Sequence, residues 1–374
     1  MSAIDEILRT APYRTSPGEH DDLFRRAVGE AVRHHCACCP PFARWYRKHA
    51  DPEAPIGDLT QLPLLPVTAF KRMRLESVET ASVVRLLKSS ATSSQTPSSV
   101  ALDATTRDRQ MRALGTLMSA MIGPRRRPFV VLDAAPTTQG VSDVELSARA
   151  AGMRGYLMMA TETRFVMTSG KDGPALDIAM LRQLLRDFVA RQVPVCLLAY
   201  TYMLYRHVVD PLERAGLRFE LPPGSFVLHF GGWKRLEAQA VGRERFNAGV
   251  TSVFAMDEPR IRDIYGFTEQ LGIIYPDDGS GVRTTPVWSE VIVRDPFTLQ
   301  PLEPHGDTPG APGLLQFITP LPYSYPGISL LLDDVGRIVT RGAGTRFEVL
   351  GRARGAEIRG CGDTLPERVY EVRL

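Results

Sequence analysis

The sequence predicts an α/β core followed by a β-rich section, and two observations carry this prediction. In the middle of the chain, short apolar runs of strand length alternate with amphipathic helical stretches, a pattern typical of parallel βαβ units. After Ile273 the helical stretches stop, and apolar runs follow one another across Gly/Pro-rich turns at residues 276–281 and 309–313. That second pattern indicates an antiparallel or barrel-like part.

Length and composition describe an ordinary globular protein with a sizeable core. The 374 residues exceed the roughly 250–300 at which single cores stop growing. A net charge of +3 gives no strong attraction to nucleic acid or to a membrane surface. We find no signal peptide, no run of the ~20 apolar residues that span a bilayer, and no disulfide framework among the five cysteines. A cytoplasmic location is therefore expected.

Apolar periodicity locates the principal elements. Three amphipathic helices are expected, over Asp21–His35, Thr105–Met121 and Asp177–Arg191, because apolar residues recur there at helical spacing. The double proline Pro40-Pro41 is expected to close the first helical region. Strands are expected at residues 129–132, 193–198, 226–230, 291–293, 314–318 and 328–332.

A hydroxyl-rich segment precedes the second helix. Residues 88–99 read KSSATSSQTPSS, between an apolar pair that ends at Leu87 and the helix expected near Thr105. Backbone amides and hydroxyls in such a loop can hold phosphate oxygens. A solvated turn has the same composition, so the segment gains meaning only in combination with later parts of the chain.

Two later segments contain groups suited to a nucleotide. Gly231-Gly232 directly follows the strand expected at residues 226–230, where bare backbone lets a flat ring lie close and where open α/β sheets bind ligands. Tyr265-Gly-Phe-Thr-Glu269 then puts a hydroxyl beside a carboxylate. Magnesium prefers one or two carboxylates together with phosphate oxygens, so Glu269 is a candidate ligand.

The order of these segments resembles the adenylate-forming superfamily, and in detail its short branch, the LuxE-type acyl-protein synthetases. The resemblance extends over nearly the whole chain from about residue 60. The matching segments are Leu64–Lys71, Ser89–Asp103, Gly231–Lys234, Tyr265–Gln270, Gly313–Phe317, Ser324–Gly327, Asp333–Gly336, Gly351-Arg352 and Ile358–Cys361. The resemblance implies an adenylate-forming α/β domain over residues 1–350, β-rich from about residue 274, and a short tail over residues 351–374.

The family resemblance implies an ATP-dependent, AMP-forming ligase that uses Mg²⁺. A carboxylic acid, fatty or of another acyl type, would attack the α-phosphate of ATP and give an acyl-adenylate, and a thiol would then take the acyl group. The implied nucleotide-binding residues are Ser89, Ser90, Thr92, Ser93, Gly231, Gly232, Tyr265, Gly266, Thr268, Asp334 and Arg352. In this assignment Gly231, Gly232 and Tyr265 pack the adenine, Asp334 binds the ribose, and Thr268 and Glu269 hold the α-phosphate and Mg²⁺.

The tail is implied to carry the acyl-accepting group. Full-length superfamily members continue beyond the Gly351-Arg352 position with a lid domain and its catalytic lysine, which is expected to be truncated here. Cys361, between Gly360 and Gly362, stands where the short branch has its acyl-accepting cysteine. We expect Lys234 to supply positive charge in place of the lid lysine. His229 either lines an acyl tunnel or is an ordinary core histidine.

Three functions remain open from the sequence. The first is self-acylation at Cys361 and transfer of the thioester to a partner protein, a reductase or a carrier. The second keeps adenylation but delivers the acyl group to a free thiol or amine. The third is a non-catalytic scaffold with the adenylate-forming fold, which is favoured by Ala91 and Ser94, since these residues replace two glycines of the family's phosphate loop.

Overall fold

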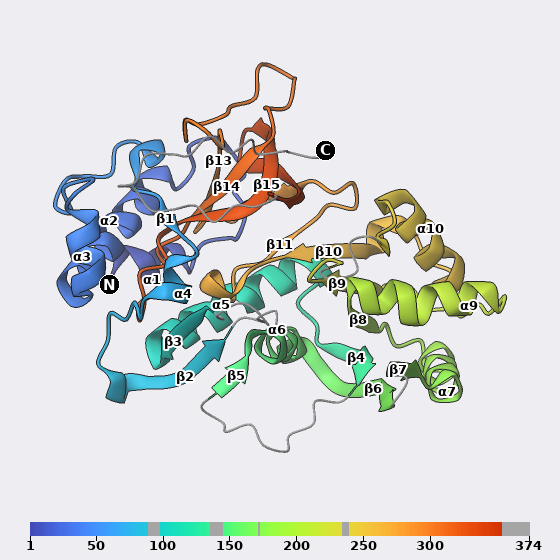
Figure 1. Ribbon diagram of the computed structural model, residues 1–374. Helices are drawn as coiled ribbons and strands as arrows, with labels where there is room; N and C mark the ends of the chain where they lie inside the picture. The colour runs from blue at the N-terminus through green and yellow to red at the C-terminus, as the bar shows by residue number, and fades with distance from the viewer. Residues whose placement is uncertain (89–97, 135–144, 171–172, 234–238, 354–374) are drawn as a thin grey trace.

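The computed structural model describes residues 1–88, 98–134, 145–170, 173–233 and 239–353 (Figure 1). Its centre is a seven-stranded sheet that is parallel except at its two edge strands. In spatial order the strands are β11 (Tyr275–Pro276), β10 (Ile261–Tyr265), β9 (Phe226–Phe230), β8 (Cys196–Tyr200), β4 (Arg127–Ala134), β6 (Ala160–Gly170) and β7 (Gly173–Leu176). The predicted parallel core is therefore confirmed.

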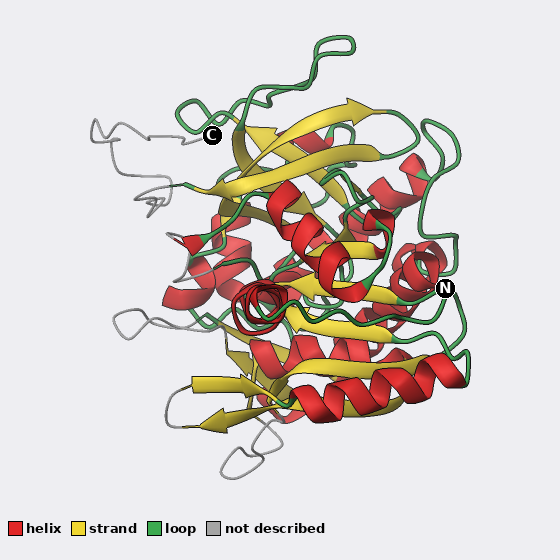
Figure 2. Cartoon of the chain, turned by 90° about the vertical axis from the view of Figure 1, so that its right-hand side faces the viewer, coloured by secondary structure: helices red, strands yellow, loops and turns green. Residues whose placement is uncertain are grey.

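Helices flank this sheet (Figure 2). They are α5 (Ala104–Ile122), α6 (Ala148–Tyr156), α7 (Ile178–Ala190), α8 (Thr201–Met203), α9 (Asp210–Arg214), α10 (Arg243–Phe254) and the π-helical turn η4 (Leu204–Val209). The two predicted helices here begin at aspartate caps: Asp103 accepts from the Thr106 amide and Asp177 from the Met180 amide, each at 2.8 Å.

A small second sheet lies beside the first. It has the order β3 (Ser99–Asp103), β2 (Val83–Lys88), β5 (Glu145–Ser147). Because Lys88 pairs with Ser99, the hydroxyl-rich segment leaves and re-enters this sheet at neighbouring positions. Residues 89–97 themselves lie outside the described residues.

The β-rich section forms an antiparallel sheet, as predicted. Its strands are β12 (Arg283–Thr284), β16 (Thr345–Arg352), β15 (Ser329–Arg341), β14 (Gly313–Ile318) and β13 (Glu290–Arg294). One further strand comes from far away in the sequence: β1 (Leu65–Pro66) pairs in parallel with β15, Leu65 opposite Leu330. The C-terminal sheet is thus completed by an N-terminal segment.

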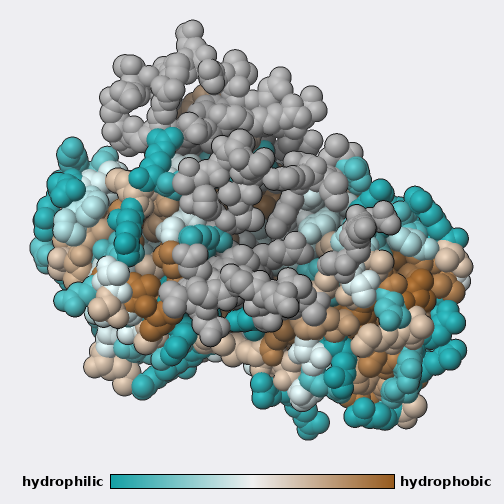
Figure 3. Space-filling view, turned by 60° about the horizontal axis from the view of Figure 1, so that its bottom comes forward, coloured by the Kyte–Doolittle hydropathy of each residue, from teal (hydrophilic) through white to brown (hydrophobic). Residues whose placement is uncertain are grey.

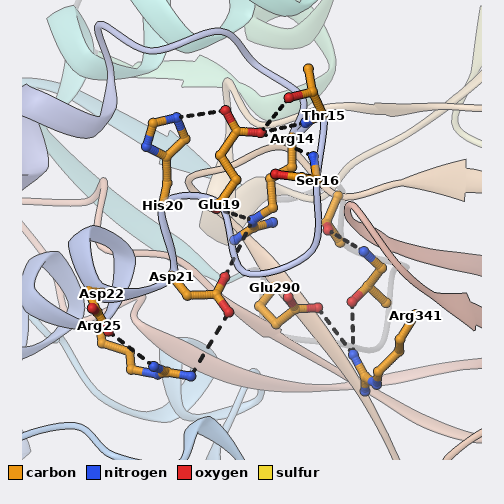
Figure 4. A network of polar contacts seen from close by, with 12 residues as sticks. Arg14, Thr15, Ser16, Glu19, His20, Asp21, Asp22, Arg25, Glu290 and Arg341 are labelled. Atoms are coloured by element: carbon orange, nitrogen blue, oxygen red, sulfur yellow. Dashed lines mark hydrogen bonds and ion pairs between the residues drawn. The ribbon is translucent and has the colours of Figure 1, made fainter.

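The N-terminal region packs on that sheet (Figure 1). It contains α1 (Ala3–Ile7), α2 (Asp21–Cys38), α3 (Pro40–Tyr46) and α4 (Ala69–Arg72). The Val287 amide donates to the Pro12 carbonyl at 2.8 Å. A polar network fixes the turn before α2: Glu19 accepts from Thr15, and Arg14 lies 3.5 Å from Asp21 (Figure 4).

Three predictions about boundaries were wrong. The strand expected at residues 328–332 runs from Ser329 to Arg341. The strand expected at residues 193–198 begins at Cys196 and runs to Tyr200. Pro40-Pro41 does not close the helical region but occupies the first turn of α3, where a missing N–H costs nothing. Single-turn 3₁₀ helices complete the secondary structure: Leu59–Gln61, Thr80–Ser82, Leu157–Met159, Glu258–Arg260 and Thr268–Gln270.

The described surface mixes residue types. Hydrophilic and hydrophobic residues are interspersed on the face seen in Figure 3. Among the helices that the structure describes, none has the length and apolar character needed to cross a membrane.

Candidate functional site

The site lies where three parallel strands end. Register pairs Tyr200 with Phe230 and Phe230 with Ile264, so β8, β9 and β10 finish at the same edge of the sheet. Gly231-Gly232 and Gly266 follow directly after β9 and β10. Open α/β sheets bind ligands at such carboxyl ends, so the sheet brings together the two segments that the sequence singled out.

The backbone of Gly231 and Gly232, directly after β9, adopts a conformation that favours glycine. Gly231 has φ 83° and Gly232 φ 60°, in the left-handed region where a Cβ causes strain. Both residues are exposed, and a Cβ on Gly232 would have no heavy atom within 4 Å. The pair therefore presents bare backbone at the edge of the sheet.

Tyr265 joins this edge to the C-terminal sheet, which lies above it in Figure 1. Its hydroxyl donates to the Asp334 carboxylate at 2.7 Å, and its ring stacks on Phe317 at 5.7 Å between centroids. Burial raises the pKa of Tyr265 well above its usual range, and the neighbouring Asp334 adds to this effect, so the phenol stays a neutral donor. The side chain expected to pack adenine therefore also holds the carboxylate expected to bind ribose.

Asp334 has a second neighbour in β16. Asp334 pairs with Arg352 in register, and the Arg352 Nε lies 3.9 Å from the Asp334 carboxylate. Burial raises the pKa of Asp334, while the Tyr265 hydroxyl and Arg352 oppose that rise. Arg352 also lies 3.7 Å from the Asp333 carboxylate, and since its side chain is 67 % exposed, both ion pairs are weak.

Glu269 is the buried carboxylate of the site. It lies in the single turn Thr268–Gln270 and is 6 % exposed. The Ser98 hydroxyl donates to Glu269 Oε1 at 2.5 Å, so a residue near the end of the hydroxyl-rich segment contacts the candidate metal ligand. Burial raises the pKa of Glu269, and the Ser98 hydrogen bond and Lys71 act in the opposite direction. Thr268, the preceding residue of the same turn, is half-buried and carries a further oxygen donor.

These oxygen donors fit a hard divalent cation. Carboxylate and hydroxyl oxygens are the ligands Mg²⁺ uses when substrate phosphates supply the remaining positions. Glu269 is the residue that would hold the ion, which would neutralise phosphate charge when bound.

A charged network behind the glycine pair was missed by sequence reasoning. His229, on β9, has its Nδ1 3.0 Å from the Thr201 hydroxyl and 3.6 Å from Asp263 on β10. Arg283 donates to Asp263 at 2.5 Å, and Arg283, His229 and Arg243 together hold the Asp263 pKa below its usual range although burial alone would raise it. His229 is thus a satisfied core histidine that braces β9 against β10. The sequence contained one signal of this contact: the two neighbouring strands each carry an ionisable residue, His229 on β9 and Asp263 on β10.

Aromatic rings collect beside this edge. Phe230 packs 4.5 Å from Tyr200 and 4.8 Å from Tyr156, and Trp233 lies 5.6 Å from Tyr205, all between ring centroids. An apolar wall next to the glycine pair suits an acyl chain better than a second charged substrate.

Several predicted site residues lie outside the described residues. These are Ser89, Ser90, Thr92, Ser93, Lys234 and Cys361.

The fold is that of adenylate-forming ligases of known structure. Two solved structures of 2-hydroxyisobutyryl-CoA ligase share its fold. An open conformation in complex with 2-HIB-AMP and CoA has a TM-score of 0.63 and 12 % identity, over 92 % of this chain and 78 % of that one. A postadenylation state with 2-HIB-AMP has a TM-score of 0.61 and 13 % identity, over 91 % and 69 %.

The chain belongs to the LuxE acyl-protein synthetase family, whose model matches residues 1–370. It is 24 % identical over 365 residues to the long-chain-fatty-acid–luciferin-component ligase of Vibrio harveyi, covering 96 % of this chain and 91 % of the relative. The protein is therefore an AMP-forming ligase that uses ATP to activate a carboxylic acid and transfers the acyl group to a thiol.

Proposed function

We propose that the enzyme transfers the activated acyl group to its own Cys361 and then to a partner protein, a reductase or an acyl carrier. In this proposal residues 1–350 form the adenylating body and residues 351–374 the acyl-carrying tail. Support comes from the family and from the site, because the last described strand ends at Arg352, beside Asp334. The tail therefore starts at the edge where the adenylate would form.

The observation that carries the adenylation half-reaction is the meeting of Tyr265, Asp334 and Glu269 at one edge of the sheet. We assign the ribose to Asp334, the adenine to Gly231-Gly232 and Tyr265, and the α-phosphate to Thr268. The carboxylate oxygen of the acid attacks the α-phosphorus, and the bond to pyrophosphate breaks. Positioning and charge neutralisation provide most of the rate in such transfers.

In the second half-reaction a thiolate attacks the acyl carbonyl, and AMP leaves as the C–O bond to the phosphate breaks. We propose a fatty or other apolar acyl group as the substrate, since the rings around Phe230 offer an apolar wall. Lys234, two residues beyond the glycine pair, is proposed to add positive charge near the reacting groups.

Intact-protein mass spectrometry tests this function. Wild type, Cys361→Ser and the control Cys38→Ser are incubated with Mg-ATP and a panel of carboxylic acids; Cys38 is an exposed cysteine of α2, outside the site. We expect an acyl-sized adduct in wild type and Cys38→Ser, and its loss in Cys361→Ser with pyrophosphate release retained.

Other outcomes identify the alternatives. Pyrophosphate release without any protein adduct would favour delivery to a free thiol or amine. Neither adduct nor pyrophosphate with any acid would favour the scaffold, and the residues Ala91 and Ser94 would then explain the loss of ATP turnover.

A further inference from the structure

The short helix α4 is fixed against the site by pairings with distant segments. The strand before it, β1, pairs with β15, and the Val67 amide donates to the Leu331 carbonyl at 3.0 Å. Phe70, 2 % exposed, packs edge-on against Tyr325 at 5.9 Å between ring centroids. Figure 1 shows α4 between the C-terminal sheet and the β2–β3 sheet. A side chain on α4 therefore has a defined position relative to both.

Lys71 lies at the centre of this helix and is half-buried. Within the ranges that the structure describes, its ammonium group has no hydrogen bond or ion pair, whereas nearby Arg74 is bonded to Glu76. Removing part of the water around an ammonium group costs free energy unless a partner replaces it. The position therefore suits an anionic ligand.

The charge of Lys71 is directed at one end of the site. The preceding residue, Phe70, packs on Tyr325, and Gly327 lies between the Tyr325 ring and the Glu269 carbonyl, since a Cβ there would be 2.8 Å from the first and 3.0 Å from the second. This packing places α4 beside the Glu269 turn, and the Lys71 charge is among the groups that oppose the rise of the Glu269 pKa caused by burial. The charged neighbour of Asp334, by contrast, is Arg352. If Asp334 marks the ribose, Lys71 is at the opposite, phosphate end, where Ser98 contacts Glu269 and the hydroxyl-rich segment meets β3.

We propose that Lys71 binds the β- and γ-phosphate oxygens of ATP and stabilises pyrophosphate as it leaves. Lysine suits this task because it is a compact point charge on a flexible stem. The inference rests on the proposed assignment of the ribose and phosphate ends. It adds a cation from a segment that is distant in the sequence from every strand of the parallel sheet. When the bond from the α-phosphorus to the bridging oxygen breaks, the electron pair stays on pyrophosphate, next to the ammonium.

Nucleotide affinity tests the proposal. Lys71→Met, the conservative Lys71→Arg and the control Lys48→Met, which changes an exposed lysine, are titrated calorimetrically with Mg-ATP and with AMP. Loss of one charge-assisted contact lowers affinity by about ten- to a hundredfold. We expect this loss for Mg-ATP in Lys71→Met, partial recovery in Lys71→Arg, and unchanged AMP affinity in all variants.

Each remaining outcome overturns the proposal in a recognisable way. Equal weakening of ATP and AMP in Lys71→Met would mean that the residue supports the fold, and unchanged ATP affinity would mean that it does not touch the phosphates. Wild type that binds neither nucleotide would reject the proposed adenylation site together with Lys71. Far-UV circular dichroism and the urea midpoint confirm that each variant is folded.

Discussion

At the scale of single residues, the hydrogen bond between Tyr265 and Asp334 connects two groups 69 positions apart. The bond orients the carboxylate, because a half-buried Asp334 without its donor would be free to rotate or to take up a proton. In the proposed site Tyr265 thus has two tasks: its ring faces the base, and its hydroxyl positions the carboxylate proposed to bind ribose. The sequence motif predicted the first task only.

Replacing Tyr265 by Phe separates the two tasks, since the ring remains and the hydroxyl is lost. We expect ATP affinity to fall about tenfold, the value of one hydrogen bond to a charged group. Discrimination against 3′-deoxy-ATP should shrink as well, because the ribose hydroxyl meets a less ordered carboxylate. Binding of ATP and 3′-deoxy-ATP, measured in parallel with the remote control Tyr13→Phe, checks both effects. If Tyr265→Phe discriminates between ATP and 3′-deoxy-ATP as well as wild type does, Asp334 binds a group other than the ribose hydroxyl.

At the scale of elements, sequence periodicity and capping residues predicted well the bounds of those helices and strands that local interactions determine. β9 has the predicted bounds, Phe226–Phe230, and α7 differs from prediction only by its capping residues. The pairing of β1 with β15 could not be predicted, because a two-residue strand has no periodicity and its partner is more than 260 residues away. The same limit applies to the site: its residues were predictable as motifs, but the contacts of Glu269 with Ser98 depend on tertiary structure.

The imidazole of His35 connects helix α2 to two segments that are distant in the sequence. His35 Nε2 donates to the Pro322 carbonyl at 3.1 Å, so the neutral Nδ1 accepts from the Ser77 hydroxyl at 2.7 Å. This arrangement requires the uncharged ring, and burial lowers the pKa of His35 to about 3.

This pKa predicts a pH dependence of stability. The unfolded chain takes up the His35 proton near pH 6.5 and the folded one near 3, so stability present above pH 6.5 is lost as the pH falls towards 3. Between pH 6 and 4, His35→Gln should reduce the slope of unfolding free energy against pH by about 1.4 kcal/mol per unit. Urea unfolding across that range measures the slope, with exposed His49→Gln as control. An unchanged slope in His35→Gln would contradict a neutral buried ring.

At the scale of the whole molecule, the two ends of the described chain support one site. N-terminal residues complete the C-terminal sheet through β1, and a single hydrophobic core includes side chains from Ala3 to Phe347. This arrangement brings helix α4, which carries Lys71, against Tyr325 of the C-terminal part. The proposed nucleotide site therefore belongs to the assembled body, and the tail, residues 351–374, is proposed to add the acyl acceptor to it.

Ending the chain after Ala353 should separate the two half-reactions. Ala353 donates its amide to the Asp333 carbonyl at 2.8 Å, and the described sheet and core are complete at that point. We expect the shortened protein to keep ATP–pyrophosphate exchange within about threefold of wild type, because Tyr265, Asp334 and Glu269 remain in place, and to form no covalent acyl adduct. Exchange assays and intact mass measure the two steps, with full-length Cys361→Ser as the matched variant. If exchange is lost in the shortened protein but kept in Cys361→Ser, the tail contributes to adenylation itself, and the boundary between body and tail at residue 350 is wrong.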